Sequence, residues 1–391
     1  MPLLQPHLSR RTRGRALLAA ALGAVAIVAA VPSGADAKTS DVKVMTRNLY
    51  LGADLTPGVR ATSPQGLVNA AGGILKSVDT NKFATRARGL SAEILKEQPD
   101  LVGLQESALW RTGPCTESPF PPKATKVRYD YTKLLLARLN KGKNRYKAVV
   151  SQNEFDFEVW TNTDNNEATS APNCPFGSEL NGRLTMRDVI LVRRGITITR
   201  TRKGNFSTLL QVKPAGAPTN VTRGWTSVDA KVGGAKIRFV NTHFEAFDSE
   251  ASNNTNKNTS VGNGQVREAQ AKELVAGPAA HNKLPVILVG DLNSDTKTEV
   301  KPGDSLAYKV MLAAKFAERS ATKPFGCCIN ADLLTTSGGG KLSDMNHKVD
   351  HVMTDTPTRV KLVRGTVTGR TRANGFWDSD HAGLFSFLRF H

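Results

Sequence analysis

The chain has 391 residues and a formal net charge of +19, a length that fits one large domain or two. No sequence repeat occurs at solenoid or propeller spacing, which excludes those repeat architectures. Beyond residue 37 no apolar run reaches the ~20 residues that a transmembrane helix needs. The basic charge favours polyanionic partners such as nucleic acid or anionic lipid, although basic charge can also serve solubility alone.

The first 37 residues have the pattern of a secretory signal. Four arginines precede an apolar run at 16–31, and Ala35-Asp36-Ala37 supplies the small-x-small pattern of a cleavage site. A membrane anchor is the alternative, but the run is short for a span and a cleavage motif follows it. We expect cleavage near Ala37, secretion, and a mature domain at 38–391. Its charge would be +16, because the removed segment carries four arginines and one aspartate.

The first half of the mature chain alternates apolar strand patterns with helical ones. Apolar residues recur at helical spacing in two segments, which predicts helices over 83–95 and 131–139. Strands are predicted over 42–48, 101–105, 146–151 and 189–192. Residues 152–182 are rich in Asn, Asp, Gly and Pro, and we expect them to form a surface excursion held by Cys174.

The second half continues the alternation. A hairpin is predicted from 221–232 and 236–241, turning at Gly233-Gly234. A polar loop is expected over 248–264. The remaining predictions are helices over 265–275 and 306–314, and strands over 285–289, 349–353, 360–367 and 384–388. This mixture indicates a packed α/β or α+β domain, and the pattern alone does not choose between them.

Four cysteines are present, at positions 115, 174, 327 and 328. Secretion permits disulfides, and four cysteines allow three pairings that sequence cannot distinguish. We expect Cys115 to pair with Cys174, because both lie in loop-like surroundings rich in Pro and Gly. No Cys/His spacing typical of a zinc site occurs.

Polar side chains follow several of the predicted strands. Asn48 ends the first strand, Glu106 follows 101–105, and His243 follows an apolar stretch. Each has an ordinary explanation: a strand-end Asn is often a turn residue, a carboxylate can be plain surface, and a lone His is more often structural. A carboxylate there is also an oxygen ligand suited to Mg²⁺. Such strand ends can converge into one pocket.

Three further groups lie at strand ends. Asp291 and Asn293 follow the strand at 285–289, and their i, i+2 spacing places both side chains on one side of an extended chain. Asp350 follows Val349, and Asp380-His381 precedes the last strand. An acid beside a His permits a metal ligand and a base at neighbouring positions.

Taken in order, these residues resemble the motif series of the endonuclease/exonuclease/phosphatase superfamily, which includes deoxyribonuclease I. The matching stretches are TRNL, LVGLQE, FVNTHFEA, VILVGDLNSD, KVDHV and SDHAGL. They extend over nearly the whole mature chain. The resemblance implies an α/β fold of four αββα layers, in which two mainly antiparallel sheets pack face to face with helices outside. It also implies a site at one edge of this sandwich and phosphodiester hydrolysis.

The resemblance implies a metal site as well. Glu106 is expected to bind Mg²⁺ or Mn²⁺, Asn48 to help hold the metal or its water ligands, and Asp380 to join them. No cysteine is among the expected site residues, which favours these ions over zinc.

The resemblance further implies catalytic roles. His381 is the expected general base, oriented by Asp350. His243 is expected to contact the phosphate or to protonate the leaving oxygen. Asp291 and Asn293 are expected to position the nucleophile and a phosphoryl oxygen, and fixed donors of this kind stabilise developing charge.

Two points stay open at this stage. In deoxyribonuclease I a carboxylate from a middle strand supports the histidine on the phosphate side. Asp188 is the matching candidate here, while the neighbouring Arg187 could instead reach a phosphate. The substrate is the second point.

For the substrate, the charge favours nucleic acid and a nonspecific nuclease. A sphingomyelinase-like phosphodiesterase acting on phospholipid head groups or small molecules is the alternative. Apolar loops at the pocket mouth would indicate that alternative, and the loops read as polar. A catalytically inactive polyanion-binding module is disfavoured by the intact motif series. We expect a monomer.

Overall fold

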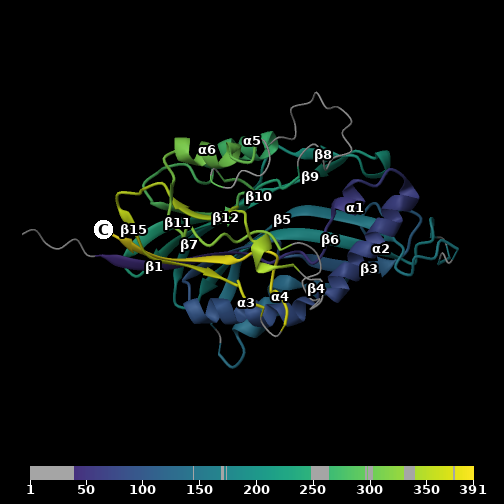
Figure 1. Ribbon diagram of the computed structural model, residues 1–391, viewed down its shortest axis with the longest axis horizontal. Coiled ribbons are helices and arrows are strands. Elements are labelled where there is room, and N and C mark those ends of the chain that lie inside the picture. Colours follow the sequence, from purple (N-terminus) through teal and green to yellow (C-terminus); the bar gives the residue numbers. More distant parts are fainter. Residues whose placement is uncertain are drawn as a thin grey trace, which may run out of the picture. The chain divides into compact units, whose positions relative to one another are not determined.

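Two β-sheets with strands running in both directions make up the centre of the computed structural model (Figure 1). The structure describes residues 39–143, 145–168, 171–172, 174–247, 264–295, 297, 303–329, 340–372 and 375–391. The predicted signal at 1–37 lies outside the described residues, as does the predicted loop at 248–264 except for Gly264. Residues 38–391 group into one unit by their mutual contacts.

The first sheet is antiparallel except for one central pair. Its order is β15 (Val360–Thr368), β16 (Gly383–Phe390), β1 (Ser40–Asn48), β2 (Leu101–Gln105), β6 (Leu180–Arg193), β3 (Leu109–Pro114) and β4 (Lys126–Asp130), and β5 (Tyr146–Thr161) also pairs with β6. The parallel pair is β1 with β2.

The second sheet repeats this arrangement, with one parallel pair at its centre. Its order is β13 (Ala317–Glu318), β14 (Asp350–Thr354), β12 (Val286–Asp291), β11 (Ala235–His243), β10 (Gly224–Val232) and β7 (Thr197–Asn205). The parallel pair is β11 with β12. Gly233 has a left-handed φ of 57° and closes the predicted β10–β11 hairpin, which is confirmed. A separate small pair is formed by β8 (Leu210–Val212) and β9 (Thr219–Val221).

The inner faces of the two sheets pack against each other. Buried apolar side chains from both sheets, among them Val44, Leu101, Phe239 and Ile287, form one cluster between them. Alternation along each strand places every second side chain on this inner face. Because the sheets approach closely, position 103 of β2 requires glycine. A side-chain carbon on Gly103 would come within 2.5 Å of atoms on β11 and β12.

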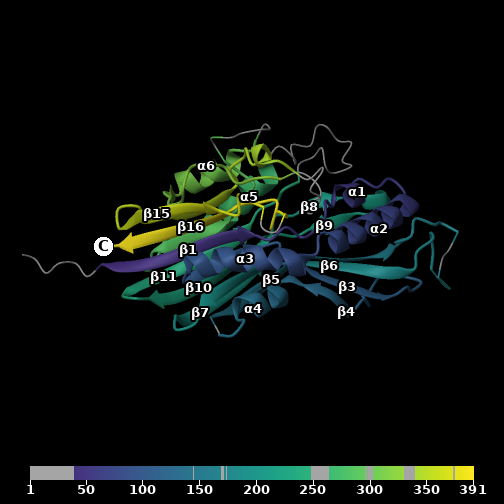
Figure 2. The same ribbon diagram turned by 60° about the horizontal axis from the view of Figure 1, so that its bottom comes forward.

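Helices cover the outer face of each sheet. On the first sheet lie α2 (Pro64–Thr80), α3 (Phe83–Glu97) and α4 (Tyr131–Leu139), and on the second lie α5 (Gln265–Ala276) and α6 (Leu306–Ala313). Figure 1 shows α5 and α6 on the opposite side of the strands from α3 and α4, and in Figure 2, with the bottom turned forward, α3 lies in front of the strands. The short helices are α1 (Thr56–Val59), η1 (Pro214–Gly216) and η2 (Leu342–Asp344). The predicted four-layer sandwich is confirmed. No described helix combines the length and apolarity needed to cross a membrane.

Most predicted elements are present, and the predicted Cys115–Cys174 disulfide is formed. The surface excursion predicted over 152–182 is wrong at both ends: β5 runs to Thr161 and β6 begins at Leu180. The reason is the alternation of Phe155, Phe157 and Val159, whose period of two outweighs the polar composition. The prediction also missed α2, although Ser63 caps it by accepting a hydrogen bond from the Gly66 amide.

Candidate active site

The two parallel strand pairs deliver polar side chains to one edge of the sandwich. On the first sheet Asn48 lies opposite Gln105, directly before Glu106. On the second sheet His243 lies opposite Asp291. Asp291 also lies opposite Asp350, where β14 begins. Strand register alone therefore brings these predicted residues to the same edge.

Asp380 and His381 enter from the loop before β16. That strand runs antiparallel to β1, so its first residues lie beside the end of β1. The fully buried Arg86 of α3 ties the two segments together, because its guanidinium donates to the carbonyls of Leu49 and Asp378 at 2.6 and 2.9 Å. Arg86 thus fixes the loop after β1 and the loop before His381 in one arrangement.

His381 lies among carboxylates. Its Nδ1 is 2.8 Å from Asp350 Oδ2, and its Nε2 is 3.6 Å from Asp291 Oδ2. Burial would lower the pKa of His381, but Asp350, Asp380 and Asp291 together raise it well above its usual range. The Asp350 contact orients the ring so that Nε2 faces the interior of the site.

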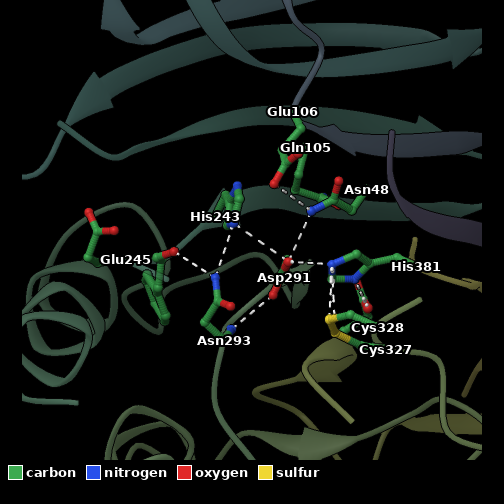
Figure 3. Close-up of polar contacts among 12 residues, drawn as sticks. Asn48, Gln105, Glu106, His243, Glu245, Asp291, Asn293, Cys327, Cys328 and His381 are labelled. Carbon is green, nitrogen blue, oxygen red and sulfur yellow. Dashed lines mark hydrogen bonds and ion pairs between the residues drawn. A yellow bond between two sulfur atoms is a disulfide. The ribbon is translucent and has the colours of Figure 1, made fainter. Parts of the chain in front are cut away.

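His243 faces the same carboxylate oxygen from the other side (Figure 3). Its Nε2 is 3.6 Å from Asp291 Oδ2 and 3.1 Å from the side-chain amide of Asn293. Arg223 Nη1 lies 3.2 Å from His243 Nδ1, and Arg223 Nη2 pairs with the buried Glu245. Burial and then the Arg223 charge lower the pKa of His243 well below its usual range, so the ring is neutral at pH 7.

Asn293 reaches the site by a route that differs from the predicted one. The two side chains do not share one side of an extended strand, because β12 ends at Asp291 and Asn293 has a left-handed φ of 46°. Asp291 Oδ1 instead accepts a hydrogen bond from the Asn293 amide at 3.0 Å, and this turn brings the Asn293 side chain to His243. The turn chemistry of Asx residues outweighs strand periodicity here.

The predicted metal ligands lie together at the edge of the first sheet. Asn48 Nδ2 donates to Glu106 Oε1 at 3.3 Å and to Asp291 Oδ2 at 3.0 Å, while its oxygen accepts from the Tyr50 amide at 2.9 Å. Burial and the neighbouring Asp380 charge raise the pKa of Glu106, and burial raises that of Asp380. The two negative charges repel each other, and a divalent cation bound between them would relieve this repulsion. Carboxylate oxygens are also the ligands that Mg²⁺ prefers.

Two buried acids lie behind His243. Glu154 and Asp188 each place a carboxylate oxygen within 4.8 Å of a His243 ring nitrogen and of each other. Arg187 turns away, because its guanidinium bonds Asp130 at 2.6 Å and the carbonyl of Ser107 at 2.9 Å. Of the two neighbours, Asp188 therefore lies at the site, and Arg187 holds the outer strands together.

Replacing Glu154 with Gln is expected to flatten the pH dependence of stability. Burial raises the pKa of Glu154 in the folded protein to about 8, against an ordinary value of 4.5. The folded protein then holds an extra proton between these values, so its free energy of unfolding falls as pH rises through this window. Urea unfolding at about pH 5 and about pH 8 measures the difference. The exposed Glu117→Gln is the control, and equal pH slopes in both variants would contradict the assignment.

The structure corrects the expectation that cysteines are absent from the site. Cys327 and Cys328 form a disulfide, and their sulfur atoms lie 3.8 and 3.7 Å from His381 Nε2 (Figure 3). No local Cys/His spacing is visible in the sequence, because 53 positions separate Cys328 from His381. Arg223 and Glu154 were also missed, because Arg223 lies within the segment predicted as a hairpin and Glu154 within the predicted surface excursion, and neither belongs to a recognisable motif.

A cleft of about 580 Å³ opens beside Glu106 and Asp380. Most of its walls are apolar, and they come from the segment around α1, from α2, and from strands β3 and β5. Among the side chains that line it are Leu55, Ile74, Trp110, Phe155, Phe157 and Phe247. The expectation of polar surroundings came from the loops, whereas these walls come mainly from helix and strand positions.

A sandwich of two sheets with acids, amides and two histidines at the ends of its central strands is the architecture of deoxyribonuclease I-like proteins. The model of the Endonuclease/Exonuclease/phosphatase family matches residues 67–381, and the chain belongs to this family. Its members are hydrolases that act on phosphodiester bonds and typically depend on a divalent metal. No curated protein sequence matches the chain significantly.

Several solved structures are similar to this chain. An endonuclease/exonuclease/phosphatase family protein from Leptotrichia buccalis is 14% identical with a TM-score of 0.50, over 89% of this chain and 99% of its own. A family member from Bacteroides vulgatus is 15% identical with a TM-score of 0.49, over 90% and 100%. D. rerio TDP2, complexed with a single strand DNA product, is 15% identical with a TM-score of 0.47, over 89% and 99%. At 14% identity, the similarity to the Leptotrichia buccalis protein shows a shared fold and nothing more.

Proposed function

We propose that this protein is a secreted phosphodiesterase that uses Mg²⁺ or Mn²⁺ and takes nucleic acid as its main substrate. One observation carries the catalytic part of the proposal: two imidazoles face the same carboxylate oxygen of Asp291, each at 3.6 Å, beside the carboxylates of Glu106 and Asp380. That arrangement offers a base, a donor and a cation site around one small volume.

His381 is the proton acceptor in this proposal. The neighbouring carboxylates raise the pKa of the His381 ring, and the charge of a cation held by Glu106 and Asp380 would favour its neutral form. In that form the Nδ1 proton donates to Asp350 Oδ2, which leaves the Nε2 lone pair to take a proton from the attacking water. Asp291, between the two rings, receives a hydrogen bond from that water and holds it in line. The Asp350 carboxylate stabilises the imidazolium that forms.

His243 is a hydrogen-bond donor in this proposal. Because Arg223 donates to Nδ1 and disfavours a second ring proton, the neutral ring carries its proton on Nε2. This N–H, together with the amide of Asn293, can donate to a phosphoryl oxygen as negative charge grows there. The geometry thus favours phosphate contact over proton donation to the leaving oxygen.

Glu106 and Asp380 would hold the divalent cation. When bound, the cation neutralises charge on the phosphodiester and polarises its phosphorus. Asn48 acts as a positioning residue, because its amide bridges Glu106 and Asp291. Its oxygen already accepts from Tyr50, so direct metal contact by Asn48 stays a prediction.

The net charge of +16 expected for the mature chain supports nucleic acid as substrate, since phosphate neutralisation dominates nonspecific binding. The apolar cleft beside Glu106 supports a second candidate, a phosphodiester that carries an acyl or alkyl group. The two candidates share the hydrolytic step and differ in what occupies the cleft.

The test compares metal-dependent hydrolysis of plasmid DNA, RNA, sphingomyelin, and ethyl and decyl esters of p-nitrophenyl phosphate. Hydrolysis that EDTA abolishes and Mg²⁺ or Mn²⁺ restores supports phosphodiesterase activity, and no turnover of any substrate counts against it. Faster turnover of nucleic acid supports the nuclease, while a higher kcat/KM for the decyl ester than for the ethyl ester supports the apolar candidate.

Leu55→Asn in the cleft is expected to lower a decyl preference. The half-buried Leu55 lines the cleft, and burial of its alkyl contact contributes about 1–2 kcal/mol. The control is Leu312→Asn on the outer helix α6, where the side chain is already 43% exposed. If both variants keep the same decyl-to-ethyl ratio, the cleft does not bind the chain.

A further inference from the structure

The disulfide between Cys327 and Cys328 lies directly against the nitrogen that the proposed mechanism uses as its base. Both sulfur atoms are within 3.8 Å of His381 Nε2. Cys327 is buried, whereas Cys328 is exposed and lines the cleft. A reductant or an ion that enters the cleft can therefore reach this pair.

Backbone hydrogen bonds hold the cysteines against His381 independently of the sulfur bond. The Ile329 amide donates to the carbonyl of Asp380 at 2.8 Å, and the Ala382 amide donates to that of Gly326 at 2.7 Å. On the other side, Cys327 exchanges two hydrogen bonds with His347. The segment around the cysteines is thus paired on both sides of His381, and we expect it to stay there after reduction.

The distances fit the edge of a tetrahedral metal site. With metal–sulfur bonds of about 2.3 Å and metal–nitrogen bonds of about 2.0–2.1 Å, sulfur and nitrogen ligands lie about 3.6 Å apart. The two observed sulfur–nitrogen distances are 3.7 and 3.8 Å. Two thiolates and an imidazole suit zinc and other thiophilic ions, whereas the carboxylates nearby suit Mg²⁺.

We propose that Cys327, Cys328 and His381 form a thiophilic metal site that exists only in the reduced protein and that inhibits the enzyme. Inhibition rests on the proposed function, because the metal would occupy the lone pair of the general base. In the oxidised protein the sulfurs are bonded to each other and carry no thiolate charge, so His381 stays free. The enzyme is then inhibited where its thiols are reduced and zinc is present, and oxidation of the thiols restores its activity.

A dithiol reductant supplies two electrons and two protons to the Cys327–Cys328 bond, giving two thiols, and is itself oxidised to a disulfide. A divalent ion then binds both sulfurs and His381 Nε2, and the two thiol protons go to solvent. An external disulfide that takes two electrons from the two sulfurs and two protons from solvent becomes a dithiol, re-forms the Cys327–Cys328 bond and releases the ion.

Co²⁺ tests the site without any need for activity. The metal-free protein is reduced with dithiothreitol, desalted without oxygen, and titrated with Co²⁺ while sulfur-to-cobalt and tetrahedral d–d absorption bands are recorded. We expect both bands to saturate at one equivalent in the reduced protein and to be absent in the oxidised protein. Reduced protein without these bands would overturn the proposal.

Matched variants identify the ligands. Cys327→Ser/Cys328→Ser should remove the bands, Cys328→Ser alone should do so too, and Cys115→Ser/Cys174→Ser should keep them, because that pair lies elsewhere in the chain. His381→Ala should weaken Co²⁺ binding roughly tenfold or more, as for other losses at metal sites. Bands that persist without Cys327 and Cys328 would place the metal elsewhere and overturn the assignment.

Activity is then measured with Mg²⁺ in excess and one equivalent of Zn²⁺, as a ratio to each variant's own zinc-free rate. Inhibition of the reduced protein but not of the oxidised protein supports the regulatory step. Equal inhibition of both, or of the Cys327→Ser/Cys328→Ser variant, contradicts it. If the cobalt bands appear and no substrate turns over, the metal site stands and the proposed function fails.

Discussion

Replacing His381 with alanine is expected to lower kcat for phosphodiester hydrolysis by about 10²–10⁴-fold while the protein stays folded. The reason is geometric: Nδ1 is held by Asp350 at 2.8 Å, and Nε2 faces Asp291 at 3.6 Å, where the attacking water would lie. Loss of a general base should lower kcat more than it raises KM, since the ring contacts the water more than the substrate. Steady-state kinetics with bis-p-nitrophenyl phosphate and Mg²⁺ measure the effect.

The matched control for this variant is His281→Ala. His281 also pairs with a carboxylate, Asp355 at 2.7 Å, but its side chain is 70% exposed and it lies at the opposite end of β12 from Asp291. Circular dichroism should show both variants folded. A His381→Ala protein that turns over as fast as His281→Ala would show that another group takes the proton.

Replacing Glu106 with Gln is expected to weaken the metal while stabilising the metal-free protein. The substitution keeps the size of the side chain and an oxygen for the Leu51 amide, which lies 2.7 Å away. In the wild type, burial and the Asp380 charge disfavour the ionised form of Glu106 and raise its pKa. The substitution removes this unfavourable charge, so the Tm of the metal-free protein should increase. The Mg²⁺ concentration for half-maximal activity should rise by at least ~10-fold.

Two readouts separate these effects. Thermal unfolding with and without Mg²⁺ should show a metal-induced rise in Tm for the wild type and little rise for Glu106→Gln, because a ligand stabilises only the state that binds it. Calorimetric titration with Mn²⁺ gives the affinity directly. The exposed Glu117→Gln should match the wild type in both. Unchanged Mn²⁺ affinity in Glu106→Gln would remove this residue from the metal site.

The sequence by itself determined the strands that carry the site. Apolar runs such as Leu101–Gln105 and Val286–Asp291 each end in a polar group, and this pattern is local, so no tertiary information is needed to see it. The order of the whole series of strand-end residues, from Asn48 to His381, was sufficient to indicate the family and hence the sandwich. Helices α3 and α4 were equally plain, since their apolar spacing and their ends lie within one segment.

Only the tertiary structure decided which groups surround the two histidines. Arg223 reaches His243 because β10 pairs with β11, and Glu154 and Asp188 lie behind the ring because the two sheets pack together. None of these contacts can be predicted from the spacing of residues along the chain, because each depends on strand register or on packing between sheets. The same holds for Asn293, which a turn rather than strand periodicity brings to the site.

The cysteines and the cleft illustrate the same physical limit. Sequence spacing can reveal a metal site only when its ligands are close along one element, whereas Cys328 and His381 meet through backbone pairing of two distant segments. The apolar cleft joins side chains from α2, β3 and β5 that are unremarkable one by one. The sequence therefore determined the family and the ends of the strands, and the tertiary structure decided the neighbours, because long-range packing sets distances that local patterns do not encode.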